Sequence, residues 1–207
     1  MINAEAQAAT VTIIDDNDGA RASLRALLES AGYQVVVYIS GTVYLKDVFP
    51  PPSDCMIVDM RMPGLSGLEL QQELVRRGNT TPLIMVTGHA DIPLAVAAVR
   101  AGAFDFFEKP YDGEALLASV GRAVDQNRDA RKSRVEAEAA KELLARLSAR
   151  ERDVLNGLAL GQSNKIIAHS LGISPRTVEA HRARLIEKME GRNLPDLVKL
   201  LRAAGMI

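Results

Sequence analysis

The sequence predicts a doubly wound α/β domain that is followed by a long helix and a small all-α domain. Between residues 11 and 111, short apolar runs alternate with amphipathic stretches. Regular alternation of this kind is typical of a parallel sheet with helices on both faces. The runs are almost continuously apolar, as strands covered on both sides are. After residue 147 the pattern is purely helical and contains no strand-like run.

The expected elements of the α/β domain follow the chain in order. The strands are the runs VTIID (11–15), QVVVY (34–38), CMIVD (55–59), PLIMV (82–86) and DFFEK (105–109). The helices between them lie near residues 19–31, 41–48, 66–77 and 91–101. A further helix is expected over 112–146, because that stretch contains no Pro, little Gly, and many Ala, Glu, Arg and Lys residues.

The long helix also contains the expected domain boundary. Its first part carries an apolar stripe that thins after Asn127 and returns near residue 143. The middle is either a solvated connector or a weak coiled coil, and we favour the connector. The expected domains are therefore 1–124 and 147–207, with residues 125–146 as a helical linker. The stripe residues are Leu116, Val120, Ala123, Val124, Leu143, Leu144 and Leu147.

Charge separates the two halves of the chain. The net charge of −1 combines residues 1–124, with 9 Lys+Arg against 15 Asp+Glu (net −6), and residues 148–207, with 10 against 6 (net +4). Opposite signs suggest different partners, although a mildly basic segment alone is a weak indicator of nucleic-acid binding.

Other features indicate a cytoplasmic protein without a membrane span. No run of about 18 apolar residues is present, and the first residues lack the basic and apolar regions of a secretion signal. The one cysteine, Cys55, lies in an expected core strand, where a reduced packing residue is expected.

Polar residues stand where four of the expected strands end. They are Asp15 and Asp16, then Asp59, Thr87 and Lys109. The carboxyl ends of parallel strands share one edge, where binding sites form. Three carboxylates suit Mg²⁺, an ammonium and a hydroxyl suit a phosphoryl group, and a carboxylate can be the nucleophile that forms an acyl phosphate. A single aspartate at a strand end is most often a cap or turn former, but the whole set favours phosphoryl transfer.

Residues 11–124 resemble the receiver domain of bacterial two-component response regulators. The motifs IIDD, VDMRMPGLSG, VTGHAD and FEKPY carry the resemblance, in order and at the usual spacing. It implies a five-stranded flavodoxin-like fold, phosphorylation of Asp59 by a sensor histidine kinase, and a bound Mg²⁺ for which Mn²⁺ can substitute. Asp16 and Asp59 would bind the metal with the backbone carbonyl of Arg61, and Asp15 would bind it through water.

The same resemblance implies a switch next to the acceptor. Lys109 would bind the phosphoryl group, Thr87 would follow it by hydrogen bonding, and Phe106 occupies the position of the switch aromatic residue. The Lys109–Pro110 peptide bond is often cis in this family. One departure is Asn17, where a third acidic residue is common.

The second domain contains the pattern of a helix-turn-helix. Ser174 followed by Pro175 predicts a helix start, and Gly172 predicts the end of a helix over about 164–170. Only a few residues then join the two helices. Solvated arginines on a plain helical hairpin are the simpler alternative. Ala168, Gly172 and Val178 fit the small residue, the turn and the buried aliphatic residue of that motif, and Val178, Leu185 and Met189 lie on one face of the second helix.

Residues 148–207 resemble a LuxR-type DNA-binding domain with four helices, through LSARERDVL, NKIIAHSLGISPRTVEAHRARLIEKM and LVKLL. Together with the domain order, TGHADIPLAVAAVRAGAFDFFEKP points to the FixJ branch of the NarL/FixJ response regulators. The resemblance implies that the helix over 175–190 enters the major groove. For His181 we favour a packing or backbone-contact role over a pH switch. The expected base-facing residues are Glu179, Ala180 and Ala183, and the expected phosphate contacts are Lys165, Arg176, Thr177, Arg184 and Lys188.

These features predict a phosphorylation-controlled transcription factor. Its expected partners are a sensor histidine kinase, promoter DNA, RNA polymerase and, when phosphorylated, a second copy of the chain. It would be an acyl-phosphate acceptor with intrinsic phosphotransfer and autodephosphorylation only, and no other enzyme activity. Two alternatives stay open: an aspartyl-nucleophile phosphatase or hydrolase that uses Asp16 and Asp18, and a constitutive DNA binder with a vestigial receiver.

Overall fold

The computed structural model describes residues 8–88, 92–189, 194–203 and 205. The chain divides into two compact units, Met1–Asp129 and Ala130–Ile207, and the division falls inside the segment 125–146 that the sequence indicates as a connector. Each unit is described by itself below. Three expectations fall outside the described residues: the first residue of the helix over 91–101, residue 190 at the end of the helix over 175–190, and the side chain of Leu94, which the sequence places with Val96 and Val99 on an apolar face of the first of these helices.

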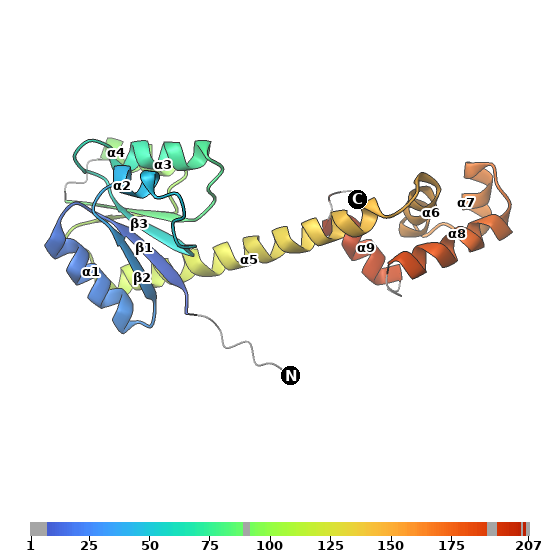
Figure 1. Ribbon diagram of the computed structural model, residues 1–207, viewed down its shortest axis with the longest axis horizontal. Coiled ribbons are helices and arrows are strands. Elements are labelled where there is room, and N and C mark those ends of the chain that lie inside the picture. The colour runs from blue at the N-terminus through green and yellow to red at the C-terminus, as the bar shows by residue number, and fades with distance from the viewer. Residues whose placement is uncertain (1–7, 89–91, 190–193, 204, 206–207) are drawn as a thin grey trace. The chain divides into compact units, whose positions relative to one another are not determined.

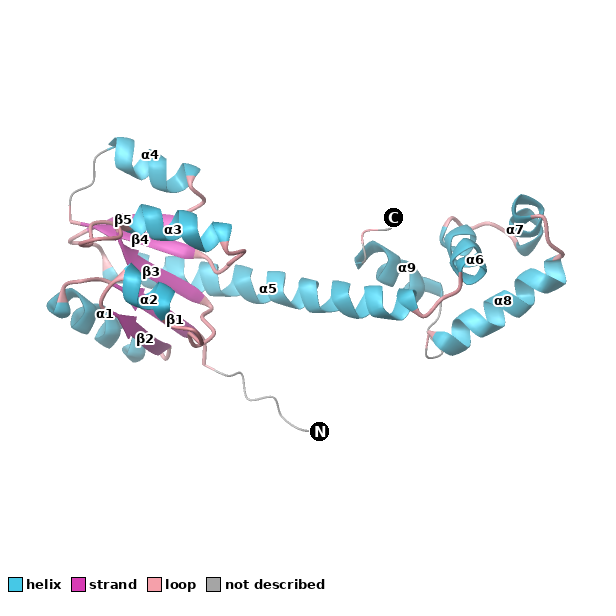
Figure 2. Ribbon diagram, turned by 45° about the horizontal axis from the view of Figure 1, so that its top comes forward, coloured by secondary structure: helices cyan, strands magenta, loops and turns pink. Residues whose placement is uncertain are grey.

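The first unit contains a five-stranded parallel sheet in the order β2-β1-β3-β4-β5 (Figures 1 and 2). This is the strand order of flavodoxin-like folds, so the predicted fold class is confirmed. The strands are β1 Thr10–Ile14, β2 Gln34–Tyr38, β3 Cys55–Asp59, β4 Leu83–Thr87 and β5 Asp105–Glu108.

Helices cover both faces of this sheet. On one face, α1 Asp18–Ser30 and the first part of α5 Gly113–Ala145 pack on Ile57 and Ile84. On the other face, α2 Gly41–Lys46, α3 Gly67–Arg76 and α4 Ile92–Arg100 pack on Met56 and Met85. Successive residues of β3 and β4 therefore point to opposite cores, which is why these strands read as continuously apolar.

The long helix α5 begins in the core of the first unit. The predicted stripe of Leu116, Val120, Ala123 and Val124 is buried. Residues 128–136 are all exposed, and the helix then contributes Ala140 and two leucines to a core of the second unit. The middle of the helix is thus solvated in this chain, as a connector would be.

The second unit contains α6 Ala149–Ala159, α7 Asn164–Leu171, α8 Pro175–Lys188 and α9 Leu194–Ala203 (Figure 2). The four helices predicted after the linker are confirmed. Leu155, Leu185 and Leu201 meet in one core, while Val154, Ile167 and Val178 meet in another. In the described part of the chain, no helix combines the length and apolar character that crossing a membrane requires.

Candidate functional site

Three of the predicted side chains meet at the carboxyl edge of the sheet. Asp15 follows β1, Asp59 is the last residue of β3, and Lys109 follows β5. The Lys109 Nζ atom lies 2.6 Å from Asp15 Oδ2 and 2.6 Å from Asp59 Oδ1. The topology thus joins residues that stand 94 and 50 positions apart in the chain.

Backbone amides hold the second oxygen of each carboxylate. The N–H of Asn17 donates to Asp15 Oδ1 (2.8 Å), and the N–H of Arg61 donates to Asp59 Oδ2 (2.7 Å). The side chains of Asp15 and Asp59 are only 3% and 8% exposed. Both carboxylates are therefore fixed between one ammonium and one amide each, which holds them ready in a single orientation.

Burial and the ion pairs with Lys109 shift the pKa values of this cluster in opposite directions. Burial raises the pKa of Asp59, although the Lys109 ammonium and the Arg61 amide partly offset this effect and the charge of Asp15 adds to it. Burial alone would lower the pKa of Lys109, but its hydrogen bonds to Asp15 and Asp59 outweigh burial and raise it. Lys109 therefore stays cationic beside a carboxylate that depends on it for charge compensation.

Asp16 lies at the same edge but does not join the other two carboxylates. Its side chain is exposed, and it lines a cavity of about 590 Å³ together with Arg61, Met62 and Ser66. Among the described residues, no three His, Cys, Asp or Glu side chains are arranged to hold a metal ion. The structure therefore brings together Asp15, Asp59 and Lys109, while Asp16 borders the adjoining cavity.

The two predicted switch residues lie on neighbouring strands. Thr87 ends β4 and is fully buried. The backbone N–H of Lys109 donates to its carbonyl oxygen at 2.7 Å. Phe106 on β5 is half-buried against the core that also contains Met85 and Ala98 of α4. The Lys109–Pro110 peptide bond is cis, as the resemblance implies.

Two further residues shape this edge of the sheet, and sequence reasoning assigned neither role. The Asn17 side chain accepts from the N–H of Ala20 (2.9 Å) and caps α1. Gly67 starts α3 so close to β3 that an added Cβ would lie 2.5 Å from the carbonyl oxygen of Asp59. Gly67 is the last residue of the motif VDMRMPGLSG, and this position is the sequence signal that could have indicated its role.

The second unit contains the predicted helix-turn-helix. Gly172 ends α7 in the left-handed conformation (φ 66°), and Ser174 caps α8, which starts at Pro175. Ala168 and Val178 are buried between the two helices, with 3% and 0% exposure. The local chemistry of the turn thus determines how α8 starts.

The exposed side of α8 carries most of the predicted DNA-contacting residues. The Thr177 hydroxyl lies 2.8 Å from that of the cap Ser174. His181 is half-buried, and its Nδ1 atom has no hydrogen-bond partner among the described residues. The exposed predicted residues are Arg176, Glu179, Ala180, Ala183, Arg184 and Lys188 on α8 and Lys165 on α7.

Lys188 has an intramolecular partner that the sequence did not reveal. Its Nζ atom lies 2.8 Å from Oε2 of the buried Glu151 and 3.3 Å from the carbonyl oxygen of Arg146. The Lys188 ammonium and the capping Ser148 lower the pKa of Glu151 to about 2. The ion pair fixes α8 against the start of α6, and a phosphate contact by Lys188 stays a prediction.

Comparisons with known proteins agree with both units. The family model described as response regulator receiver domain matches residues 11–121, and the one described as bacterial regulatory proteins, luxR family, matches residues 145–201. The chain is 47% identical over 202 residues to the transcriptional regulatory protein FixJ of Azorhizobium caulinodans, covering 95% of this chain and 93% of that protein. It is 38% identical over 194 residues to the response regulator protein TodT of Pseudomonas putida, covering 94% and 86%.

Two solved structures extend the similarity over nearly the whole chain. The response regulator StyR is 37% identical with a TM-score of 0.82, covering 94% of this chain and 98% of that one. Full-length FixJ from B. japonicum is 42% identical with a TM-score of 0.59, covering 96% and 98%.

Proposed function

Because this chain belongs to the NarL/FixJ-type response regulators, which regulate transcription under the control of phosphorylation, we propose that Asp59 is its phosphoryl acceptor. The observation that carries this assignment is the position of Lys109 Nζ, 2.6 Å from both Asp15 and Asp59. Of the two carboxylates held by Lys109, Asp59 is the last residue of a strand, whereas Asp15 follows one. Phosphorylation of the wild type and of Asp59→Asn by a small donor tests the assignment.

The residues around Asp59 suit nucleophilic attack on phosphorus. A carboxylate oxygen of Asp59 forms the new O–P bond, and the N–P bond to the phosphorylated histidine of the kinase breaks, with its electron pair going to the imidazole nitrogen. Lys109 holds the acceptor before the transfer and binds an oxygen of the phosphoryl group after it. The Arg61 amide orients the attacking carboxylate. Autodephosphorylation, the attack of water on the same phosphorus, completes the cycle.

The donor set also fits a hard divalent cation. Asp15 and Asp59 bring two negative charges against one ammonium, and Asp16 adds a third at the edge of the neighbouring cavity. We propose that Asp16, Asp59 and the Arg61 carbonyl hold Mg²⁺, or Mn²⁺ in its place, with Asp15 contributing through water. The bound ion would neutralise charge on the transferred group.

Metal binding should depend on Asp16 more than on Asn17. Asp16→Asn is expected to weaken Mg²⁺ binding by at least about tenfold, because it removes one of few anionic ligands. Asn17→Asp should change it little, since the Asn17 side chain caps α1 and aspartate caps helices equally well. Calorimetric titration with Mg²⁺ measures both. Unchanged affinity in Asp16→Asn would remove Asp16 from the site.

Phosphorylation is proposed to act through β4, β5 and α4. The phosphoryl group draws the Thr87 hydroxyl toward it, and Phe106 rotates into the space that Thr87 leaves. Phosphorylation thereby favours one of two pre-existing states. On α4, next to β5, Val96 and Val99 are 43% and 60% exposed. We propose that this α4 face pairs two receivers about a two-fold axis, which suits two half-sites of a nearly palindromic operator.

Phosphorylation should therefore convert monomer to dimer through α4. Wild-type chain treated with a small acyl-phosphate donor is expected to sediment as a dimer. Val99→Asp should keep the treated chain monomeric, because it places a charge in an apolar contact. Val75→Asp is the matched control, since Val75 on α3 is 61% exposed. If the phosphorylated wild type stays monomeric at concentrations where it binds a full operator, receiver dimerisation is contradicted. Two copies would then be brought together by the DNA alone.

In the second unit, we propose that α8 reads the major groove and that exposed cations on α7 and α8 contact phosphates. The exposed Glu179, Ala180 and Ala183 recur at helical spacing on one side of α8. The proposed phosphate contacts are Lys165, Arg176, Thr177, Arg184 and Lys188, of which Thr177 and Lys188 also have intramolecular partners. For the half-buried His181, a packing or backbone-contact role is proposed. RNA polymerase is the proposed further partner of the DNA-bound protein.

Two substitutions on α8 should separate binding strength from sequence preference. Arg184→Ala should weaken binding to all duplexes similarly and reduce the salt slope by about 1, because it removes a phosphate contact. Glu179→Ala should change discrimination between sites by about 1–3 kcal/mol, because it removes a base-facing group. Salt-dependent binding to selected and scrambled duplexes measures both. An equal loss of sequence preference in the two variants would contradict this division of roles.

The phosphatase reading has less support in the structure. It would need Asp16 as the nucleophile and Asp18 as a second acid. Asp18 is paired with Arg21, and neither carboxylate approaches Lys109. The relatives described above are transcriptional and response regulators. A vestigial receiver is also disfavoured, because Asp15, Asp59, Thr87 and Lys109 are all present at the correct strand ends.

A further inference from the structure

The outermost strand on one side of the sheet is β2, and among the described strands it pairs with β1 alone (Figure 2). The N–H of Gln34 donates to the carbonyl oxygen of Ala9, which precedes β1 (2.9 Å). In a parallel pair, alternate residues of the outer strand turn their backbone groups toward the neighbour. The even-numbered residues of β2 therefore bond to β1, while the N–H and C=O groups of Val35 and Val37 point away from the sheet.

β2 lacks the features that usually protect such a strand. Its sequence, QVVVY, contains no charged residue, no proline and no glycine. Its register with β1 is regular over all five residues, so it contains no bulge. Charge, proline and bulges are the usual means by which proteins prevent outer strands from pairing with another chain. The side chain of Val37 is also 39% exposed. The outer side of β2 is therefore ready to accept a further strand.

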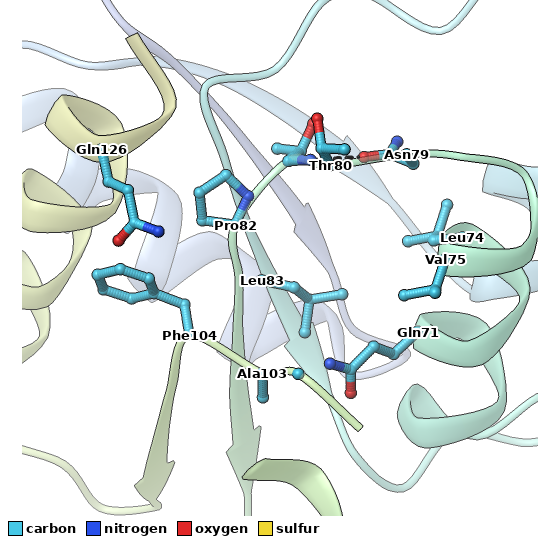
Figure 3. Close-up of a pocket in the computed structure, with 12 residues that line it drawn as sticks. Gln71, Leu74, Val75, Asn79, Thr80, Pro82, Leu83, Ala103, Phe104 and Gln126 are labelled. Carbon is cyan, nitrogen blue, oxygen red and sulfur yellow. Dashed lines mark hydrogen bonds between the residues drawn. The ribbon is translucent and has the colours of Figure 1, made fainter. Parts of the chain in front are cut away.

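The outermost strand on the other side, β5, is protected. It has only four residues, begins with Asp105 and ends with Glu108. The hydroxyl of Ser119 on α5 donates to the Asp105 carboxylate at 2.5 Å. The start of β5 also borders a cavity of about 550 Å³, which Phe104 and Gln126 of α5 both line (Figure 3). Charged ends and contacts with α5 thus protect β5, whereas β2 has neither charge.

Exposed apolar side chains continue from β2 into the residues that follow it. Ile39, Val48 and Phe49 are 58%, 80% and 88% exposed. The Asp47 carboxylate accepts from the Tyr38 hydroxyl at the end of β2 (2.7 Å) and from the N–H of Phe49 (3.0 Å). Asp47 thus holds Phe49 near the end of β2, and the strand and these side chains form one apolar surface. Surfaces of this kind usually mark a protein–protein contact.

The chemistry of β2 fits a second copy of the same strand. If two β2 strands pair antiparallel about a two-fold axis at Val37, each Val37 lies opposite its own copy and Val35 lies opposite Ile39. The outward-facing backbone groups of one strand then meet those of the other. All three side chains are β-branched and uncharged, so no like charges face each other. The contact is also isologous, so it closes at two copies.

We propose that the outer side of β2 is a pairing surface for a second copy of this chain, formed by antiparallel pairing of the two β2 strands. The contact includes neither Asp59 nor α4, so it requires no phosphorylation. A surface of this size gives a weak contact, with a Kd on the order of 10⁻⁴ M. Because α4 lies next to β5 on the other side of the sheet, a chain paired through α4 keeps β2 open to a further copy.

Sedimentation of the unmodified full chain tests the proposal. The wild type should be mainly dimeric at about 1 mM and mainly monomeric at about 10 µM. Val37→Lys should weaken dimerisation by at least about tenfold, because a lysine on an outer strand opposes pairing. Its ammonium can reach water from a site that is 39% exposed, so the fold should persist.

Two control variants separate this contact from others. Val135→Lys makes the same change on α5, where Val135 is 64% exposed, and it should dimerise as the wild type does. Val99→Asp removes the apolar contact proposed for α4, and it should also dimerise at about 1 mM without phosphorylation.

Amide hydrogen exchange locates the contact on the backbone. At about 1 mM the N–H groups of Val35 and Val37 should exchange about fivefold more slowly than at about 10 µM, because pairing gives them acceptors. The N–H of Val36, which bonds to β1 in both states, should change little.

Four results would overturn the proposal. The first is a wild type that stays monomeric at about 1 mM, which would leave β2 to a strand of another protein. The second is a Val37→Lys variant that dimerises as the wild type does. The third is loss of the dimer in Val99→Asp or Val135→Lys, and the fourth is a wild-type dimer with unchanged exchange at Val35 and Val37. If Val37→Lys does not fold, as judged by its amide spectrum, the exchange result decides the matter.

Discussion

Asp59→Asn is expected to take no phosphoryl group from a small acyl-phosphate donor, whereas the wild type takes one. The carboxylate is the attacking group, and an amide oxygen is too weak a nucleophile to replace it, so the rate should fall by on the order of 10³-fold or more. The substitution keeps the size of the side chain, and the new amide oxygen can still accept from the Arg61 N–H, so the fold should persist. Intact-protein mass measures the added group.

Asp129→Asn is the matched control, because Asp129 is an exposed aspartate on α5. It should be phosphorylated at the wild-type rate. If Asp59→Asn gained the same mass as the wild type, the acceptor would be another residue, and Asp15 or Asp16 would be examined next.

Lys109→Met is expected to lower the rate of phosphorylation by about 10²–10³-fold, because it removes the cation that binds the transferred group. It should also change the pH dependence. Burial and Asp15 would still raise the pKa of Asp59, while the lowering by Lys109 would be lost. The pKa of Asp59 would then rise further above its ordinary value. Because only the ionised carboxylate attacks, the fall in rate toward acid should begin at higher pH than in the wild type.

The pH profile separates this role from a structural one. Lys46→Met removes an exposed lysine at the end of α2 and should leave both the rate and the profile unchanged. A slower Lys109→Met with the wild-type pH profile would mean that Lys109 binds the phosphoryl group without controlling the ionisation of Asp59.

The sheet and its functional edge could be predicted because their signals are local. β3 and β4 read as continuous apolar runs since both of their faces are buried, and parallel strands bring their carboxyl ends to one edge. The N-cap Ser174 and the proline at the first helical position, Pro175, likewise determine where α8 starts. Each of these features depends on residues within one element, so the sequence pattern is sufficient.

Contacts between distant segments could not be predicted in the same way. The pairing of Lys188 with Glu151 spans 37 residues and depends on how α8 packs on α6. The close approach of Gly67 to the backbone of Asp59 likewise depends on the spacing of packed elements. Asp16 shows the limit of predicting such contacts from the sequence. The sequence pattern groups it with Asp15 and Asp59, but its side chain does not join theirs and lines the cavity that Arg61 also borders.

The measurement that tests the central claim most directly is the DNA affinity of the full chain with and without acetyl phosphate. The duplex is selected from random-sequence DNA by the wild-type chain, and the salt concentration is held constant. Phosphorylation of Asp59 should raise the affinity by about tenfold or more, in line with a typical coupling free energy between sites, and Asp59→Asn should show no change. Equal affinity of the phosphorylated and unphosphorylated wild type, or an equal increase in Asp59→Asn, would contradict control of DNA binding through Asp59.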